Sequence, residues 1–189
     1  MKVHLSNVRL SFPQLWEAKM VQGQGEPKFS AAFLFPKDHA VVKLLSEAVL
    51  AAATEKWSVK AEEILKVLKA ADKLAVHDGD SKSDYDGYAG NYFLNASCKV
   101  RPLVIGQQRE ALAAADGKPY SGCYVNAVVE IWAQDNQFGK RVNASLMGVQ
   151  YLRDGDRLAG GAIASADDFQ TIPQEGATAP AEAGAASLF

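Results

Sequence analysis

Aromatic and cationic side chains share the polar faces of several predicted strands. They occupy alternating positions, so they point away from the aliphatic residues of the same strand. Flat rings stack on unpaired bases and cations follow phosphates, which is the chemistry of single-stranded nucleic-acid binding. The predicted contact residues are Phe93, Lys99 and Arg101 on one strand, Tyr124 and Trp132 on the next, Lys140 and Arg141 at the start of the last, and Lys28 on an earlier strand.

A competing interpretation places two of these rings in the protein core. The predicted helices must cover one outer face of the sheet, and Phe93 and Trp132 would be core residues if they lie under that cover. Periodicity shows which side of a strand a residue occupies, but not what covers that side. Both interpretations stay open at the level of the sequence.

The stretch from His77 to Asn91 is predicted to be a long loop, and it contains two further rings. Tyr85 and Tyr88 are flanked by aspartates and glycines. Either these tyrosines stack on bases from a mobile flap, or they pack the loop against the rest of the protein. Both tyrosines are included among the predicted nucleic-acid contacts.

The same loop is rich in aspartate, whose carboxylates suit Mg²⁺ and Ca²⁺. A calcium loop that starts at Asp78 needs glycine at its sixth position and glutamate at its twelfth, where this chain has Ser83 and Ala89. No metal site is therefore predicted. A metal-dependent nuclease is kept as an alternative function, with carboxylates from Asp78, Asp80, Asp84 and Asp86.

Other catalytic signatures do not occur in the sequence. The three histidines, His4, His39 and His77, lie in no recognisable nucleophile motif, and no glycine-rich phosphate loop follows a predicted strand. We therefore expect a protein that is not an enzyme and that needs no cofactor.

The elements that must position these residues begin with two strands. The first changes phase at Ser6-Asn7, as a β-bulge would produce, and Pro13 is predicted to end it. The second covers Lys28 to Phe35 and is closed by Pro36.

Two helices are predicted next. The first has Asp38 as its N-cap and apolar residues at helical spacing from Val41 to Ala52. The second follows Trp57-Ser58, and its predicted inner face consists of Ile64, Val67, Leu68 and Ala71.

Three more strands follow, over 92–100, 123–134 and 141–152. Their predicted inward sets include Leu94, Ala96, Cys98 and Val100 on the first, and Cys123 to Ala133 at every second position on the next. Because strands and helices do not alternate, the pattern favours a mainly β fold, a small five-stranded antiparallel barrel with two helices inserted between strands 2 and 3.

Composition and charge divide the chain into two parts. With 48% hydrophobic and 22% charged residues, the chain is typical of a globular protein, and we predict one domain over residues 1–160. Residues 161–189 are predicted to form a flexible acidic tail, because four acids and no lysine or arginine follow Ala164 and aliphatic residues are scarce. The tail ends in the apolar pair Leu188-Phe189, a candidate partner-binding tip.

The compartment follows from what the sequence lacks. Cys98 and Cys123 are too few for a disulfide framework, no apolar run approaches the roughly 20 residues of a membrane span, and Met1 opens no signal-peptide pattern. We expect a cytoplasmic protein with buried thiols.

Three motifs resemble a family of bacteriophage single-stranded DNA-binding proteins first catalogued as a domain of unknown function. The motifs cover 28–38, preceded by 8–12, then 120–127 (YSGCYVNA), and 152–158 (LRDGDRL), followed by Asp167-Asp168-Phe169. The similarity spans roughly residues 2–170.

The resemblance implies an oligonucleotide/oligosaccharide-binding (OB) barrel that coats single-stranded DNA during phage replication and recombination in the host bacterium, often as a dimer. It further implies that the tail ending in Leu188-Phe189 recruits replication or recombination proteins and competes with DNA. A virion or scaffold assembly module is a further alternative.

Overall fold

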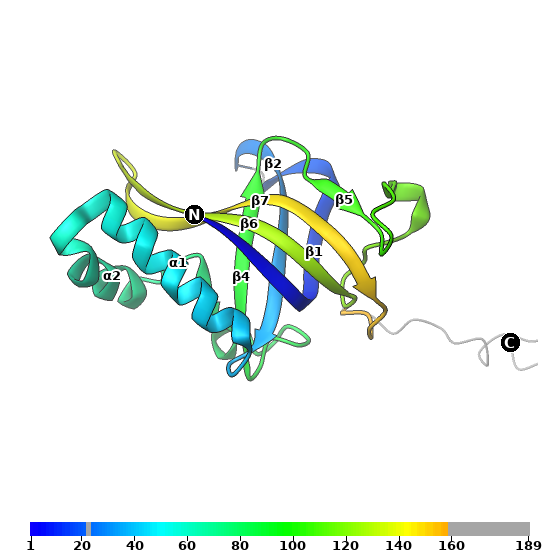
Figure 1. The fold of residues 1–189 in the computed structure, drawn as a ribbon, viewed down its shortest axis with the longest axis horizontal. Coiled ribbons are helices and arrows are strands. Elements are labelled where there is room, and N and C mark those ends of the chain that lie inside the picture. Colours follow the sequence, from blue (N-terminus) through cyan, green and yellow to red (C-terminus); the bar gives the residue numbers. More distant parts are fainter. Residues whose placement is uncertain (22–23, 159–189) are drawn as a thin grey trace, which may run out of the picture.

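The computed structural model describes residues 1–21 and 24–158, and its strands form one sheet in the order β3-β4-β2-β1-β6-β7-β5 (Figure 1). β4 also pairs with β7, so β4, β2, β1, β6 and β7 close into a five-stranded barrel. This confirms the mainly β, OB-like class. The strands are β1 (Lys2–Val21), β2 (Gln24–Pro36), β3 (Val76–Asp78), β4 (Asn91–Cys98), β5 (Leu103–Ile105), β6 (Tyr124–Asn136) and β7 (Gly139–Arg153).

The barrel strands pair antiparallel except where β4 meets β7. There Ser97 pairs with Ser145 in parallel orientation. The short β5 was not predicted; it adds to β7 in parallel, with Leu103 opposite Gly148. Three residues are too few to show an alternating pattern in the sequence.

β1 is interrupted by two irregularities. The pairing of β1 with β6 shifts register between Leu5 and Val8, and Asn7 has a φ of 52°, which confirms the predicted bulge. A second shift, against β2, lies between Ser11 and Gln14. Pro13 falls within it, where the ladder needs no N–H from that residue. The prediction that Pro13 ends the strand is therefore wrong.

The helical insertion between β2 and β3 consists of α1 (Ala40–Trp57) and α2 (Ala61–Ala70), joined by a 3₁₀ turn over Ser58–Lys60. Figure 1 shows the two helices beside one end of the barrel, where the β6–β7 hairpin extends along them. The cap of α1 is His39 rather than Asp38, because His39 Nδ1 accepts from the backbone N–H of Val41 at 3.2 Å.

The predicted inner face of α2 is partly wrong. Ala61 and Leu68 are buried and Ile64 is half-buried, whereas Val67 and Ala71 are exposed. Leu65, half-buried and packed on the core, takes part in the inner face in place of Val67. None of the helices in the described ranges is long and apolar enough to cross a bilayer.

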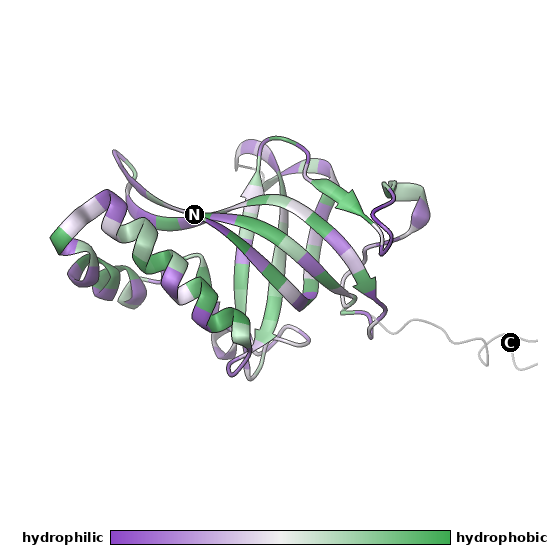
Figure 2. Ribbon diagram, in the orientation of Figure 1, coloured by the Kyte–Doolittle hydropathy of each residue, from purple (hydrophilic) through white to green (hydrophobic). Residues whose placement is uncertain are grey.

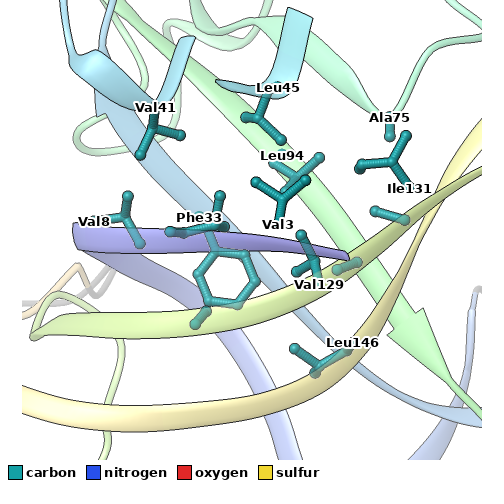
Figure 3. Close-up of a cluster of buried hydrophobic side chains, with 14 of the residues drawn as sticks. Val3, Val8, Phe33, Val41, Leu45, Ala75, Leu94, Val129, Ile131 and Leu146 are labelled. Carbon is teal, nitrogen blue, oxygen red and sulfur yellow. The ribbon is translucent and has the colours of Figure 1, made fainter. Parts of the chain in front are cut away.

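The core fills the barrel and the space between the barrel and α1. Val41 and Leu45 of α1 point toward Val3, Phe33, Leu94 and Ile131 of the barrel strands (Figure 3). Hydrophobic and hydrophilic residues alternate along these strands (Figure 2). Of the predicted inward set, Cys123 just before β6 and its alternate residues up to Ile131 are buried, and Ala133 is half-buried. On β4 the inward set ends at Ala96, because Cys98 is half-buried and Val100 is exposed after the strand ends.

A second, smaller cluster lies on the outer face of the barrel. It consists of Leu34, Tyr88 and Phe93, with Leu158 packed against it. The stretch predicted as one long loop begins with β3, which pairs with β4, and continues as a 3₁₀ turn over Gly79–Lys82 before residues 83–90 return over this cluster. We call residues 79–90 the flap. The predicted tail, 161–189, and its tip Leu188-Phe189 lie outside the described residues.

Candidate nucleic-acid interface

A groove of about 1090 Å³ opens on the outer surface of the barrel and is lined by residues from β2, β4, β6, β7 and the flap. Asn95 and Ser97 of β4 and Asn143 and Ser145 of β7 are outward-facing residues in its lining. These strands bury the alternate residues Leu94, Ala96, Val142 and Ala144 in the core. The alternation that builds the barrel therefore also gives the groove a polar surface.

One end of the groove is aromatic and is formed by Phe12 and the flap. The side chains of Phe12 and Tyr85 are 55% and 50% exposed, and their rings meet edge to face with centroids 5.4 Å apart. Tyr88 is 3% exposed, lies against Phe93, and places its hydroxyl 3.3 Å from Ser11 Oγ. Burial raises the pKa of Tyr88. Tyr88 therefore packs the flap down, while Tyr85 offers its ring to solvent.

Phe12 points outward because of the irregular backbone at the second shift of β1. Its φ is 45°, a left-handed conformation that bulky residues rarely adopt. Leu10 and Ser11 just before it are both buried, so no alternating pattern leads to an exposed Phe12. The distorted backbone therefore places an exposed ring beside Tyr85, at the aromatic end of the groove.

The groove crosses the paired strands in the order β1-β2-β4-β7-β6, so Trp132 of β6 lies at the end opposite Phe12 of β1. Its side chain is 41% exposed, and its Nε1–H donates to Ser145 Oγ on β7 at 2.9 Å. Trp132 pairs with Asn143 across the β6–β7 ladder. The hydrogen bond fixes the ring by its edge while part of the ring stays in solvent. The interpretation of Trp132 as a core residue is wrong.

The charged residues in the described lining of the groove are all cationic, namely Lys28, Lys82, Lys99 and Arg141. His77 also lines the groove, with its Nδ1 2.6 Å from a carboxylate oxygen of Asp72. Lys99 pairs with Glu26 at the rim, and this contact lowers the pKa of the Glu26 carboxyl. Lys82 lies over the Phe93 ring at 5.1 Å. Within the ranges that the structure describes, Lys28, Lys82 and Arg141 form no ion pair with a carboxylate. The groove is thus suited to a polyanion.

The flap is attached to the barrel by Lys37. Its Nζ lies 2.9 Å from an oxygen of Asp78 and 2.6 Å from one of Asp80, and the hydrogen bonds from Lys37 lower the pKa of both carboxyls. Asp80 also accepts from the N–H of Gly90 at 2.7 Å, which ties the two ends of the flap together. A side chain at Gly79 would collide with the backbone of Tyr88, so this close approach requires glycine.

The same contacts bear on the alternative magnesium site. An ammonium group lies between two of the four aspartates that the site would need. No group of three potential ligands comes together anywhere in the described residues.

Six of the ten predicted nucleic-acid contacts line the groove, namely Lys28, Tyr85, Tyr88, Lys99, Trp132 and Arg141. Four do not. Phe93 is 2% exposed beneath Tyr88. Arg101 lies over the Trp16 ring at 5.0 Å, and Lys140 pairs with Asp135 beside Trp57. Tyr124 lies at the other end of β6, under Arg153.

Sequence reasoning missed one aromatic residue and one lysine of the lining, Phe12 and Lys82. Lys82 lies in the 3₁₀ turn of the flap, where no periodicity marks its direction, and Phe12 directly follows Leu10 and Ser11, which are both buried. The available signal for Phe12 was the Phe-Pro pair itself, since a proline inside a strand indicates an edge or a bulge.

Comparison with known proteins gives the groove a context. Residues 1–179 match the family model of the ssDNA-binding protein of Enterobacter phage Enc34. A protein called p50 from Acyrthosiphon pisum secondary endosymbiont phage 1 is 47% identical over 175 residues, which cover 91% of this chain and 94% of p50.

Solved structures agree with this match. The single-stranded DNA-binding protein from bacteriophage Enc34, in complex with ssDNA, is 30% identical with a TM-score of 0.72, over 84% of this chain and 89% of that one. The single-stranded DNA-binding protein gp2.5 of bacteriophage T7 is 12% identical with a TM-score of 0.56, over 96% and 99% of the two chains, and shows a shared fold. The chain belongs to the phage single-stranded DNA-binding protein family typified by the Enc34 protein.

Proposed function

We propose that this chain binds and coats single-stranded DNA in the groove, without catalysis, during phage replication or recombination. The observation that carries the proposal is the lining of the groove, with exposed rings at both ends and cations as its charged residues. Membership of the family supports the same ligand class, since the Enc34 relative is solved in complex with ssDNA.

The geometry favours single strands over duplex. Trp132 and Tyr85 can stack only on bases whose faces are free, and paired bases in a duplex cover one another. The asparagines and serines between the rings can donate to and accept from any base, and every base has a π-face. We therefore expect weak sequence preference.

A salt titration tests the proposal. Fluorescence anisotropy of labelled oligo(dT) and of a duplex of equal length, each at several salt concentrations, should show preference for the single strand. Affinity should fall with salt, with a slope of about −0.7 per phosphate neutralised. Equal affinity for duplex, or no binding to the single strand, would refute the proposed function.

The tail extends the proposal to regulation and partners. The four acids after Ala164 would compete with DNA for the cationic groove, and Leu188-Phe189 would contact a replication or recombination protein of the phage or of the bacterial host. A chain ending at residue 160 should bind DNA more tightly at low salt. Unchanged affinity would mean that the tail does not enter the groove.

The assembly state and the compartment belong to the same proposal. A homodimer is expected from the family resemblance, and sedimentation of the full chain tests it. The bacterial cytoplasm is the expected compartment, and the free thiols of Cys98 and Cys123 suit its reducing conditions.

A further inference from the structure

The two motifs at 120–127 and 152–158 take no part in the groove, yet they pack against each other. The Leu158 N–H donates to Ser121 O, and Ser121 Oγ donates to Leu158 O, both at 3.1 Å. A side chain at Gly122 would collide with the backbone of Asp156 and Arg157. This close contact fixes the position of the second motif on the barrel.

The packed motifs present two arginines on tyrosine rings. The guanidinium of Arg153 lies 3.5 Å from the centroid of Tyr124, and that of Arg157 lies 4.3 Å from the centroid of Tyr120. Both arginines are exposed, and in the part of the chain that the structure covers neither pairs with a carboxylate. Arg153 Nη2 donates to Asn7 Oδ1 at 3.2 Å. Stacking and this bond hold the guanidinium of Arg153, stacking holds that of Arg157, and the remaining N–H groups of both can donate to a phosphate.

The surface of Arg9, Tyr120, Tyr124, Arg153 and Arg157, which we call the arginine–tyrosine patch, adjoins the aromatic end of the groove. Arg9 donates to Gly122 O at 3.2 Å and to Asp156 O at 2.8 Å. Its Nη1 lies about 3.5 Å from where a side chain at Gly87 of the flap would begin. Gly87 lies between Tyr85 and Tyr88 in the sequence, so the patch begins where the groove ends.

We propose that single-stranded DNA leaving the groove at Phe12 and Tyr85 continues onto the arginine–tyrosine patch, where Arg153 and Arg157 each contact a phosphate. This inference rests on the proposed function and lengthens its binding site. Of the two acids in the motif, Asp154 accepts from Tyr120 at 2.8 Å and pairs with Lys118 at 3.6 Å. Asp156 contacts Arg9 through its backbone oxygen, and within the described residues its carboxylate forms no ion pair.

Oligonucleotides of different lengths distinguish DNA contacts with the patch from DNA contacts with the groove. We would measure affinity and salt slope for oligo(dT) from about 4 to about 16 nucleotides, the range of site sizes for one OB fold. The variant is Arg153→Gln/Arg157→Gln. The matched control is Lys43→Gln/Lys60→Gln, which removes the same charge from exposed positions of the helical insertion.

The inference predicts that the patch variant binds the shortest oligonucleotides like the wild type, which also shows that it is folded. For the longest ones its salt slope should be about 1.4 units shallower, because two phosphate contacts at about 0.7 each are lost. The control should keep the wild-type slope. Wild-type slopes at every length, or equal losses at every length, would overturn the inference. A wild-type protein that binds no oligonucleotide would overturn the proposed function itself.

Discussion

The two ends of the groove hold their aromatic rings by different means. Trp132 lies on a regular ladder, pairs with Asn143, and is fixed by a hydrogen bond to Ser145 on the neighbouring strand. Phe12 lies in a bulge with a left-handed backbone, and Tyr85 lies on a flap attached through Lys37. A ring on a ladder is as rigid as the barrel, whereas rings on a bulge and a flap depend on local contacts that substitution can remove separately.

The largest expected effect is on the free energy of unfolding, at Phe93, which lies beneath Tyr88 at the aromatic end of the groove. Phe93→Ala should lower the free energy of unfolding by about 3–5 kcal/mol, because it empties a buried site beneath Tyr88. Thermal and urea denaturation measure this loss, and Phe93→Leu should cost less. If Phe93→Ala kept full stability and instead lost DNA affinity, Phe93 would be a contact residue and the flap would have to open.

The two exposed rings should each contribute comparably to binding. Trp132→Ala and Tyr85→Ala should each weaken oligo(dT) binding by about 1–3 kcal/mol, the usual value of one base stack. Anisotropy titrations at fixed salt measure the loss, and Trp132→Phe and Tyr85→Phe should retain most of the affinity. If only one end responded, the strand would not run the length of the groove.

Substitution of Phe12 should affect DNA binding and the free energy of unfolding differently, because Phe12 lies in the second irregularity of β1. Phe12→Gly should weaken DNA binding by about 1–3 kcal/mol, because a stacking ring is lost. It should leave the free energy of unfolding within about 1 kcal/mol of the wild type, since glycine tolerates the φ of 45° and offsets the lost packing. Phe12→Ala keeps the strained backbone and should be less stable than Phe12→Gly. The reverse order would argue against strain at this position.

The smallest effect concerns the attachment of the flap. Lys37→Gln should weaken DNA binding only a few-fold, because it affects only the aromatic end of the groove. Its effect should therefore vanish in a Tyr85→Ala background.

The same ion pairs make stability depend on pH. Lys37 lowers the pKa of Asp78 and Asp80, so the stability from these ion pairs is complete above the usual aspartate pKa of about 3.9 and is lost as the pH falls through the lowered values. Denaturation of wild type and variant should therefore converge in acid. A constant difference at all pH values would contradict this role.

The sequence predicted the regular parts of this molecule and the first irregularity of β1, at Ser6-Asn7, but missed the second irregularity at Phe12. Alternation along β6 placed Val129 on the inward face and Trp132 on the outward face, as observed, because the pleat of a paired strand fixes the direction of each side chain. It left open whether Trp132 is covered. The helical insertion followed from apolar spacing, although the position of its cap did not. Phe12 was missed because a left-handed residue breaks the alternation on which the prediction depends.

Alternation shows which face of the sheet a side chain occupies, but it does not show where along the barrel that side chain lies or what covers it. Tyr124 and Trp132 have the same parity on β6, yet Tyr124 lies with the arginine–tyrosine patch and Trp132 in the groove. Phe93 faces outward like Asn95, but the flap covers it. These outcomes depend on contacts between segments far apart in the chain, which one sequence does not reveal.

Tryptophan emission tests the central claim, that Trp132 stacks on DNA bases in the groove, most directly. Oligo(dT) should quench the emission of the wild-type protein to saturation, and added salt should reverse the quenching. Trp132→Phe should still bind in anisotropy titrations but lose most of the quenching, although Trp16 and Trp57 remain. Quenching of the same depth in Trp132→Phe and wild type would place the DNA elsewhere on the protein and contradict the account.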